Sequence, residues 1–530
     1  MHTVGSFAGS SRINPSMKRV LLFVVDGCTS RVLRPLVDDG ALPTFAALRD
    51  RGTLAYDCLS IFPSITPAAT ASIVTGRYPQ DHGIAGMSWW DPATDRVSYY
   101  GDDVWTVLQR GLGTFMRDFL LRLNGDRLRA PTIFETAERQ GRRAGCINHL
   151  IFRGDVAHEV RIPTLLSLWP GVPSGLTVRG PSLLCLGDLV SNYPQPEDLS
   201  LEEGGPFNRY GFDDQGTEDF LLDLEGAGEL PDVTVAYLAD YDFDSHGRGP
   251  HGAADTLRMV DGRLASVFEA WGGVDRVLED ACILLTADHA HSDVRPGDPG
   301  RLVLPDLLAG YRTAGPGAPW DHEDIMACPN MRVAEIYFRR GGRVTVQDVS
   351  ATLLEDARVD QVIWREHDGP GGEYCVATRD RGRLRFSPAE GTGDAVDAYG
   401  AGWHLHGDLS AVDAQTTRSG GLHYGRYPNG LERIGAALAS QPVGRVLVTA
   451  TPGCEFAMPG QSVHGGAGSH GTLHELDSLV PLLMAGVPAG VRLPEAPRIV
   501  DVEPLCRQML ALDGGLPPGA SHMKRAPPGR

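Results

Sequence analysis

The sequence predicts an α/β protein with a doubly wound, mostly parallel central sheet that is flanked by helices. Two observations lead to this fold class. Short aliphatic runs each end in a turn that carries Asp or Thr, and segments with helical spacing lie between these runs. Continuous apolar runs are typical of strands buried on both faces of a parallel sheet, and helices connect such strands.

The expected elements follow from these two patterns. The expected strands are residues 20–25, 233–238, 282–286 and 446–450. The expected helices are residues 42–48, 133–142, 254–271 and 431–439. The carboxyl ends of parallel strands share one edge of a doubly wound sheet, where ligands bind. We therefore expect Asp26, Asp242 and Asp288, which follow three of the runs, to meet at that edge.

Composition limits the partners and the compartment. The 530 residues include 48 Lys+Arg and 67 Asp+Glu, a net charge of −19, and no basic run is longer than a short pair. A broad nucleic-acid-binding surface is therefore not expected, and a bound metal is the obvious positive charge for an anionic substrate. No run reaches the ~20 apolar residues of a membrane span, and no signal-peptide pattern is present. Nine scattered cysteines without a C-x-x-C pair indicate free core thiols, so we expect a cytoplasmic protein.

The first block with candidate chemistry is residues 62–84. Thr66-Pro67 in this block predicts a helix start, with Pro at the first helical position. The Thr66 hydroxyl would face the positive end of the helix dipole, which favours an alkoxide and an incoming anion. For a threonine considered alone, a simple N-cap is the more common role.

Three further blocks carry carboxylates and imidazoles. Asp242 and His246 are four residues apart after a predicted strand, and they can offer an oxygen and a nitrogen to one metal ion. Asp240 and Asp244 could take the same role, and an Asp-rich turn is often only a solvated loop. The adjacent pair Asp288-His289 supplies two further ligand types at a strand end.

The last block is a glycine-rich segment over residues 464–475. It contains His464, His470 and His474, and chemistry alone does not decide among these three as a metal ligand. Glycines beside a histidine let the backbone approach a crowded site closely, although a flexible surface loop has the same composition.

Together and in this order, the blocks resemble the alkaline phosphatase superfamily, most closely its type I phosphodiesterase and nucleotide pyrophosphatase branch. The shared order is Asp-Gly, Pro-Ser-x-Thr, Thr-Gly-x-Tyr-Pro-x-x-His-Gly-Ile, Asp-x-x-x-His-x-x-Gly-Pro, Asp-His and a late His-Gly. The resemblance covers residues 19–90, 133–340 and 427–512. It implies an alkaline-phosphatase-like fold with inserted cap segments.

The resemblance also implies two metal sites, with zinc as the usual ion. One site would use Asp242, His246 and His470. The other would use Asp26, Asp288 and His289, together with the hydroxyl of Thr66. Three Asp and three His suit zinc. The implied activity is hydrolysis of a small-molecule phosphodiester or nucleotide pyrophosphate through a covalent phospho-Thr66 intermediate.

One departure from the branch bears on the substrate. The residue three positions after the nucleophile is commonly Asn, which donates to a phosphoryl oxygen, and here it is Ala69. A phosphomonoesterase or a phosphonate hydrolase would use the same metals. Outside enzymes, a catalytically silent binding protein on this fold is the alternative, although all seven implied ligand positions carry competent residues.

Asp26 and His470 can share one site only if residues 18–512 form a single domain. Insertions are expected at about residues 87–131 and 341–426, with disordered tails at residues 1–17 and 513–530. The first insertion carries an apolar helical face that we expect to pack on the core, consisting of Trp105, Leu108, Leu112, Phe115, Met116, Phe119, Leu120 and Leu123. Residues 204–228 are expected to be a loop, and residues 365–426 an irregular region.

Overall fold

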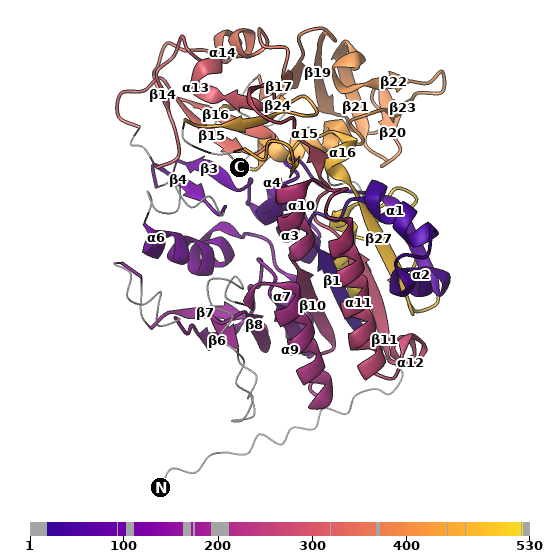
Figure 1. Cartoon of the computed structure of the whole chain (residues 1–530). Helices are drawn as coiled ribbons and strands as arrows, with labels where there is room; N and C mark the ends of the chain where they lie inside the picture. Colours follow the sequence, from indigo (N-terminus) through magenta and orange to yellow (C-terminus); the bar gives the residue numbers. More distant parts are fainter. Residues whose placement is uncertain are drawn as a thin grey trace.

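Two sheets organise the chain (Figure 1). The computed structural model describes residues 18–92, 94–101, 111–162, 171–172, 175–191, 211–317, 320–366, 372–441, 444–459, 461, 463–520 and 522. In the view of Figure 1 the central sheet and its helices form the lower part of the molecule, and the second sheet lies above them.

The central sheet has eight strands. Their order is β2 (Gly52–Leu59), β27 (Leu479–Ala485), β11 (Ala281–Thr286), β1 (Arg19–Val25), β10 (Val233–Leu238), β5 (Ala144–Ile147), β8 (Leu183–Leu186) and β9 (Val190–Ser191). The five strands from β11 to β8 run parallel, whereas β27, β2 and β9 are antiparallel to their neighbours. The predicted mostly parallel sheet is confirmed.

Strand β1 lies in the middle of the sheet, between β10 and β11. All residues of β10 and β11 are buried, as are those of β1 after Arg19, which explains their unbroken apolar sequences. The predicted strands 20–25, 233–238 and 282–286 correspond to these three. Because β10, β1 and β11 are adjacent and parallel, the acidic residues that follow them meet at one edge.

Helices flank the sheet, with α9 (Asp214–Gly226) and α11 (Ala254–Ala270) side by side along it (Figure 1). All four predicted helices are present, as α2 (Pro43–Asp50), α7 (Ile133–Arg139), α11 and α15 (Gly430–Ala439). Residues 204–228 were expected to be a loop, but α9 lies within them. The Asp213 side chain caps this helix, and Phe220 and Leu224 bury its apolar face. These interactions stabilise a helix despite the acidic, glycine-containing composition that is typical of a loop.

The second sheet has eleven strands. Their order is β14 (Thr313–Ala314), β15 (Ile325–Asn330), β16 (Val333–Phe338), β24 (Arg445–Ala450), β17 (Val359–Arg365), β18 (Tyr374–Ala377), β19 (Arg383–Pro388), β21 (Gly402–Gly407), β20 (Ala395–Asp397), β23 (Gly421–Tyr424) and β22 (Ala414–Thr416). One face of this sheet packs against α14 (Val346–Leu353), and the opposite face packs against α15.

The predicted strand 446–450 belongs to this second sheet and not to the parallel one. As β24 it pairs antiparallel with β16 and β17. Val446 and Val448 pack into one apolar core and Leu447 into another, on the opposite face. Burial on both faces gives the same unbroken apolar pattern in either kind of sheet, so the pattern did not reveal the direction of pairing.

Residues 365–426 are likewise not irregular, because the strands from β18 to β23 lie there. Leu384 and Phe386 of β19 are buried on one face while Arg383 is exposed. These strands are only three to six residues long, and glycine and aspartate turns separate them, so the alternation of buried and exposed side chains was too short to be recognised.

The segment predicted to be the first insertion, about residues 87–131, begins with a hairpin of β3 (Ser88–Asp91) and β4 (Arg96–Tyr99). It continues into α6 (Leu112–Arg117) and a π-helical segment (Asp118–Arg127). Trp105 and Leu108 lie outside the described residues. Met116, Leu120 and Leu123 are buried in the core around the central sheet. Leu112 and Phe119 pack against the same core, so the expectation that this apolar face packs on the core is confirmed for its described residues other than Phe115.

Other sequence-based expectations concern cysteines and chain ends. All nine cysteines are free and buried, as expected. Residues 1–17 and 523–530 lie outside the described part of the chain. Residues 513–520 carry no helix or strand, and the Gly519 amide donates to Asp501 at 2.7 Å. Among the described residues, none of the helices combines the length and the apolar character needed to cross a membrane.

Glu503 on α17 (Val502–Met509) makes the stability of the fold depend on pH. Burial raises the pKa of Glu503 from its ordinary 4.5 to about 7, although Arg507 and Arg77 act in the opposite direction. The folded state therefore binds the Glu503 proton more tightly than the unfolded chain does. This contribution is complete below about pH 4.5 and is lost as the pH rises through about 7.

Glu503→Gln is accordingly expected to stabilise the protein more at pH 8 than at pH 5, by up to about 3 kcal/mol. Denaturant unfolding of both proteins at the two pH values measures this difference. Glu279→Gln, at an exposed glutamate on α12 (Val274–Asp280), is the control and should show no comparable pH-dependent gain. Equal effects of Glu503→Gln at the two pH values would contradict the assignment.

Candidate metal centre

The first group of candidate ligands lies at the ends of β1 and β11. Asp26 follows β1 directly, and Asp288 and His289 follow β11. His289 Nε2 lies 3.5 Å from Asp26 Oδ1 and 3.5 Å from Asp288 Oδ2. The amides of Gly27 and His289 donate to Asp288 Oδ1 at 3.2 and 3.0 Å, which leaves Oδ2 directed at the group.

Thr66 joins this first group from another part of the chain. It is the first residue of α3 (Thr66–Thr75), with Pro67 second, and its Oγ1 lies 2.9 Å from His289 Nε2. Ile65 occupies the N-cap position without a side-chain bond, so Thr66 is not a simple N-cap. Its partly buried hydroxyl thus lies both beside the ligand group and at the positive end of a helix.

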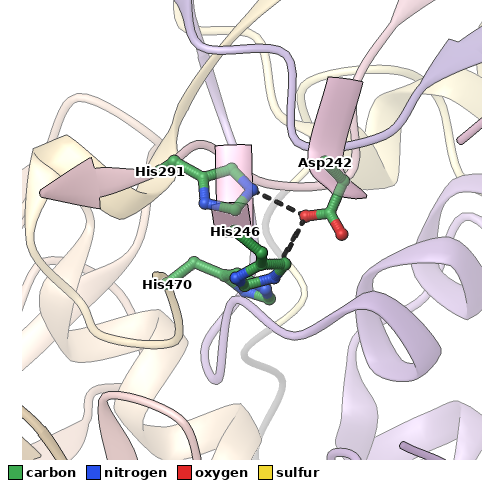
Figure 2. A group of neighbouring side chains, drawn as sticks. All are labelled: Asp242, His246, His291 and His470. Carbon is green, nitrogen blue, oxygen red and sulfur yellow. Dashed lines mark hydrogen bonds and ion pairs between the residues drawn. The ribbon is translucent and has the colours of Figure 1, made fainter. Parts of the chain in front are cut away.

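The second group is centred on α10 (Asp240–Arg248), which follows β10. Asp242 and His246 are one turn apart on this helix, so they share a face, and His246 Nε2 lies 3.5 Å from Asp242 Oδ1. His470 approaches from the C-terminal part of the chain, with its Nε2 3.9 Å from the same oxygen. His291 completes the group (Figure 2).

Backbone pairing brings the loops of the second group together. The short strands β12 (Ser292–Asp293) and β26 (Gly468–Ser469) pair antiparallel, with Ser292 opposite Ser469. Strand β12 directly follows His291, and β26 directly precedes His470. The two groups also touch one another, because Asp242 Oδ1 lies 3.9 Å from His289 Nε2.

Backbone carbonyls orient the imidazoles of His246 and His470. His246 Nδ1 lies 2.9 Å from the Gly468 carbonyl, and His470 Nδ1 lies 2.7 Å from the Ser64 carbonyl. A carbonyl can only accept, so each Nδ1 carries the proton and each Nε2 presents a lone pair to the group. This is the arrangement in which histidine binds a metal ion.

The electrostatics of both groups favour a cation. Burial raises the pKa of Asp26 well above its usual range, and the carboxylates of Asp242 and Asp288 raise it further. Burial and the neighbouring imidazoles hold the pKa of His246 and His470 well below the usual value, so these rings are neutral ligands. Repelling carboxylates beside neutral imidazoles are stabilised by positive charge between them.

The unsatisfied atoms provide an independent test of this fit. Buried atoms without a hydrogen-bond partner in the described part of the chain include Asp26 Oδ1, Asp288 Oδ2, His246 Nε2 and His470 Nε2. Such atoms are costly unless something else pairs with them. The donor atoms within each group lie within 4.8 Å of one another, so one ion per group would satisfy them.

All seven residues expected at the site thus come together. The alternative ligands Asp240, Asp244 and His474 are engaged elsewhere. Asp244 Oδ2 binds Arg248 at 2.7 Å, and Asp240 exchanges hydrogen bonds with Asp214. His474 is the N-cap of α16 (Glu475–Ser478), where its Nδ1 accepts from the Leu476 amide.

His464 lies beside the second group without belonging to it. Its ring lies 4.1 Å from that of His246, and its Nδ1 contacts Glu455 at 3.0 Å. Its side chain is 31% exposed, so it lies at the rim of the second group. It is not part of either ligand group in the described structure.

Sequence reasoning missed two features of the centre. His291 was not considered as a site residue, although it stands only two positions after His289 in the segment Asp288-His289-Ala290-His291. The other feature is Arg332, whose fully buried guanidinium binds Asp477 Oδ1 and the Ser292 hydroxyl. No local pattern marks an arginine as the partner of an aspartate 145 residues away.

The Arg332–Asp477 pair connects the loop that carries His470 with the loop that carries His289 and His291. The Arg332 amide donates to the His470 carbonyl at 3.0 Å, and Asp477 accepts from the Thr472 amide at 3.0 Å through Oδ2. The Asp477 carbonyl accepts from the Ala290 amide at 3.0 Å. The buried pair therefore holds the loops of His470 and of His289 in a fixed relation.

Comparison with known proteins agrees with the ligand pattern. The profile of the type I phosphodiesterase / nucleotide pyrophosphatase family matches residues 20–419. The chain belongs to this family. The match includes six of the seven implied ligand positions, and the seventh, His470, lies beyond its end.

The curated relatives align over short segments. Ectonucleotide pyrophosphatase/phosphodiesterase family member 1 from Homo sapiens is 32% identical over 110 residues, which are 18% of this chain and 12% of the human protein. Its counterpart from Rattus norvegicus is 36% identical over 72 residues, 14% of this chain and 8% of the rat protein. The chain thus aligns with about a tenth of the length of these relatives.

Solved structures of similar fold cover nearly the whole chain. Murine ectonucleotide pyrophosphatase / phosphodiesterase 5 has a TM-score of 0.54 at 14% identity, covering 94% of this chain and 97% of the murine one. Phosphonoacetate hydrolase from Sinorhizobium meliloti 1021, in complex with phosphonoformate, has a TM-score of 0.54 at 17% identity, covering 93% and 96%. These likenesses establish the shared fold.

Arg332→Met is expected to lower the free energy of unfolding by about 3–5 kcal/mol, because Asp477 would remain buried without its charged partner. Denaturant unfolding measures the change. Arg312→Met is the control, since the Arg312–Asp324 pair is exposed and its loss should have a far smaller effect. Equal stability of the Arg332→Met protein and the wild type would contradict the role of the pair.

Proposed function

We propose that this protein hydrolyses phosphoric esters, of the phosphodiester or nucleotide pyrophosphate type, with Thr66 as the nucleophile at a two-metal centre. The observation that carries the proposal is the convergence of two ligand groups beside one hydroxyl. Thr66 Oγ1 lies 2.9 Å from His289 of the first group, and Asp242 of the second group lies 3.9 Å from the same histidine nitrogen.

The residues of each group suit one divalent cation. Asp26, Asp288 and His289, with Thr66, would hold the first, and Asp242, His246 and His470 the second. Oxygen and nitrogen donors in this proportion are typical of zinc sites in enzymes. Two such cations supply the positive charge that lowers the pKa of a coordinated hydroxyl and offsets the charge of phosphoryl and leaving-group oxygens.

Thr66 would carry out the displacement at phosphorus in two steps. Thr66 Oγ1 would form a bond to phosphorus while the bond from phosphorus to the leaving oxygen breaks, which gives a phospho-Thr66 intermediate. Water would then attack phosphorus and release Thr66 in its original state. The amino-terminal end of α3 lies at Thr66, so its helix dipole favours the incoming anion.

Neighbouring hydroxyls on α3 are engaged elsewhere, which supports Thr66 as the nucleophile. Thr70 Oγ1 donates to the Thr66 carbonyl at 2.6 Å, and Ser72 Oγ lies 3.0 Å from His82 Nε2. Ala69 is fully buried in the core and brings no donor to the phosphoryl group.

The substrate class rests on the family and on its relatives. An inactive variant of murine ectonucleotide pyrophosphatase / phosphodiesterase 5, with a TM-score of 0.53, was solved in complex with AMP. A nucleotide ester is therefore the first substrate to test. Ala69 stands where the branch commonly has a donor, so a phosphonate and a phosphate monoester remain the second candidates.

Thr66→Ala is expected to lower kcat by at least ~10³-fold, because the attacking oxygen is lost while the ligand groups remain. Steady-state turnover of an aryl phosphodiester measures the loss. Thr75→Ala is the matched control, a buried threonine of the same helix whose hydroxyl donates to the Ala71 carbonyl at 2.6 Å. Full activity of a folded Thr66→Ala protein would refute the nucleophile assignment.

Removal of metal is expected to abolish turnover, and zinc should restore it. The measurement compares matched phosphate diester, monoester, pyrophosphate and phosphonate substrates before chelation, after chelation and after reloading. Asp242→Ala should weaken the second site and lose activity in the same assay. Turnover that survives complete chelation would refute the metal-dependent mechanism, and turnover of the phosphonate alone would replace the proposed substrate class.

A further inference from the structure

His291 contacts the second ligand group differently from its other histidines. Its Nε2 lies 2.6 Å from Asp242 Oδ1, whereas the Nε2 atoms of His246 and His470 lie 3.5 and 3.9 Å from that oxygen. Two donors on one tetrahedral zinc ion, each 2.0–2.1 Å away, are separated by ~3.3 Å. His246 and His470 fit that separation more closely, and the shorter His291 distance is that of a charge-assisted hydrogen bond.

The position of the His291 ring is fixed by its surroundings. Its amide donates to Thr29 Oγ1 at 3.0 Å, and its carbonyl accepts from Arg31 Nη2 at 2.9 Å. The ring itself lies between two glycines. A Cβ at Gly27 would stand 2.7 Å from His291 Nε2, and a Cβ at Gly468 would stand 3.1 Å from His291 Nδ1. The ring is fully buried in this slot.

Asp242 Oδ1 is the atom that most needs to be held in place. It lies within 4 Å of nitrogens from His246 and His470 in its own group and from His289 in the other. Its carboxylate is also repelled by that of Asp26, whose Oδ1 lies 3.5 Å from the same His289 nitrogen. A donor that binds Oδ1 both fixes its direction and offsets part of this repulsion.

From this geometry we infer that His291 is a positioning residue, which donates its Nε2–H to Asp242 Oδ1 and so orients the carboxylate for the second metal ion. His291 is then not a fourth ligand of that ion. A metal ion at this group would then be held by three protein side chains, those of Asp242, His246 and His470. The inference rests on the proposed function only in that it requires a metal ion at this group.

Metal affinity of two His291 variants tests the inference. His291→Leu is expected to weaken binding of one of two zinc ions by 10–100-fold, measured by competition with a chromophoric chelator. His291→Gln keeps an N–H donor and should recover most of that loss. His158→Leu is the control, since His158 is a buried histidine that bonds to the Pro181 carbonyl, and it should bind zinc like the wild type.

A structure of the zinc-loaded wild type provides a second test that requires no variant to fold. His291 Nε2 should remain at hydrogen-bond distance from Asp242 and more than 3 Å from zinc. A bond of ~2.0–2.1 Å from His291 to zinc would overturn the inference, because His291 would then be a ligand.

The outcomes also separate this inference from the proposed function. Two bound zinc ions with unchanged affinity in His291→Leu would overturn the inference alone. If His291→Gln bound zinc as weakly as His291→Leu, the inference would be overturned too, because an amide donor would then not substitute for the imidazole. A wild-type protein that binds fewer than two ions would contradict the proposed function and the inference together.

Discussion

The concentration of like charge at the carboxyl edge of the central sheet is the constraint on which the rest of the structure depends. Asp26 and Asp288 are buried there, and Asp242 lies beside them. Buried carboxylates without partners are costly, and a chain with a net charge of −19 offers no general positive field to offset them. Cations held by the two ligand groups would offset this charge locally, and in the proposed function they would supply positive charge where the phosphoric ester binds.

The second sheet contributes to this centre although none of its strands carries a candidate ligand. Arg332 lies between β15 and β16 and donates hydrogen bonds to Asp477 and Ser292. It thereby connects two loops from distant parts of the chain. The pairing of β12 with β26 adds a second connection between the same loops. Loops connected in this way hold the candidate ligands at fixed separations, which the proposed two-metal centre would require.

Much of the centre was predictable because it follows from local sequence. A buried strand that ends in an acidic residue is a local pattern, and three adjacent parallel strands bring Asp26, Asp242 and Asp288 to one edge. His470 was different, since chemistry did not separate it from His464 and His474, and only the family resemblance favoured it. The structure separates the three by placing His464 at the rim and His474 at a helix cap.

The sequence by itself predicted the fold class, the strands β1, β10 and β11, and the candidate ligand residues in their order along the chain. Only the tertiary structure decided that residues 446–450 join an antiparallel sheet, that residues 365–426 form strands, and that His291 lies against Asp242. The physical reason is that these features depend on partners far away in the chain. Ser292 and Ser469, which bring the histidine loops together, are 177 residues apart, and neither segment carries a local signal that names the other.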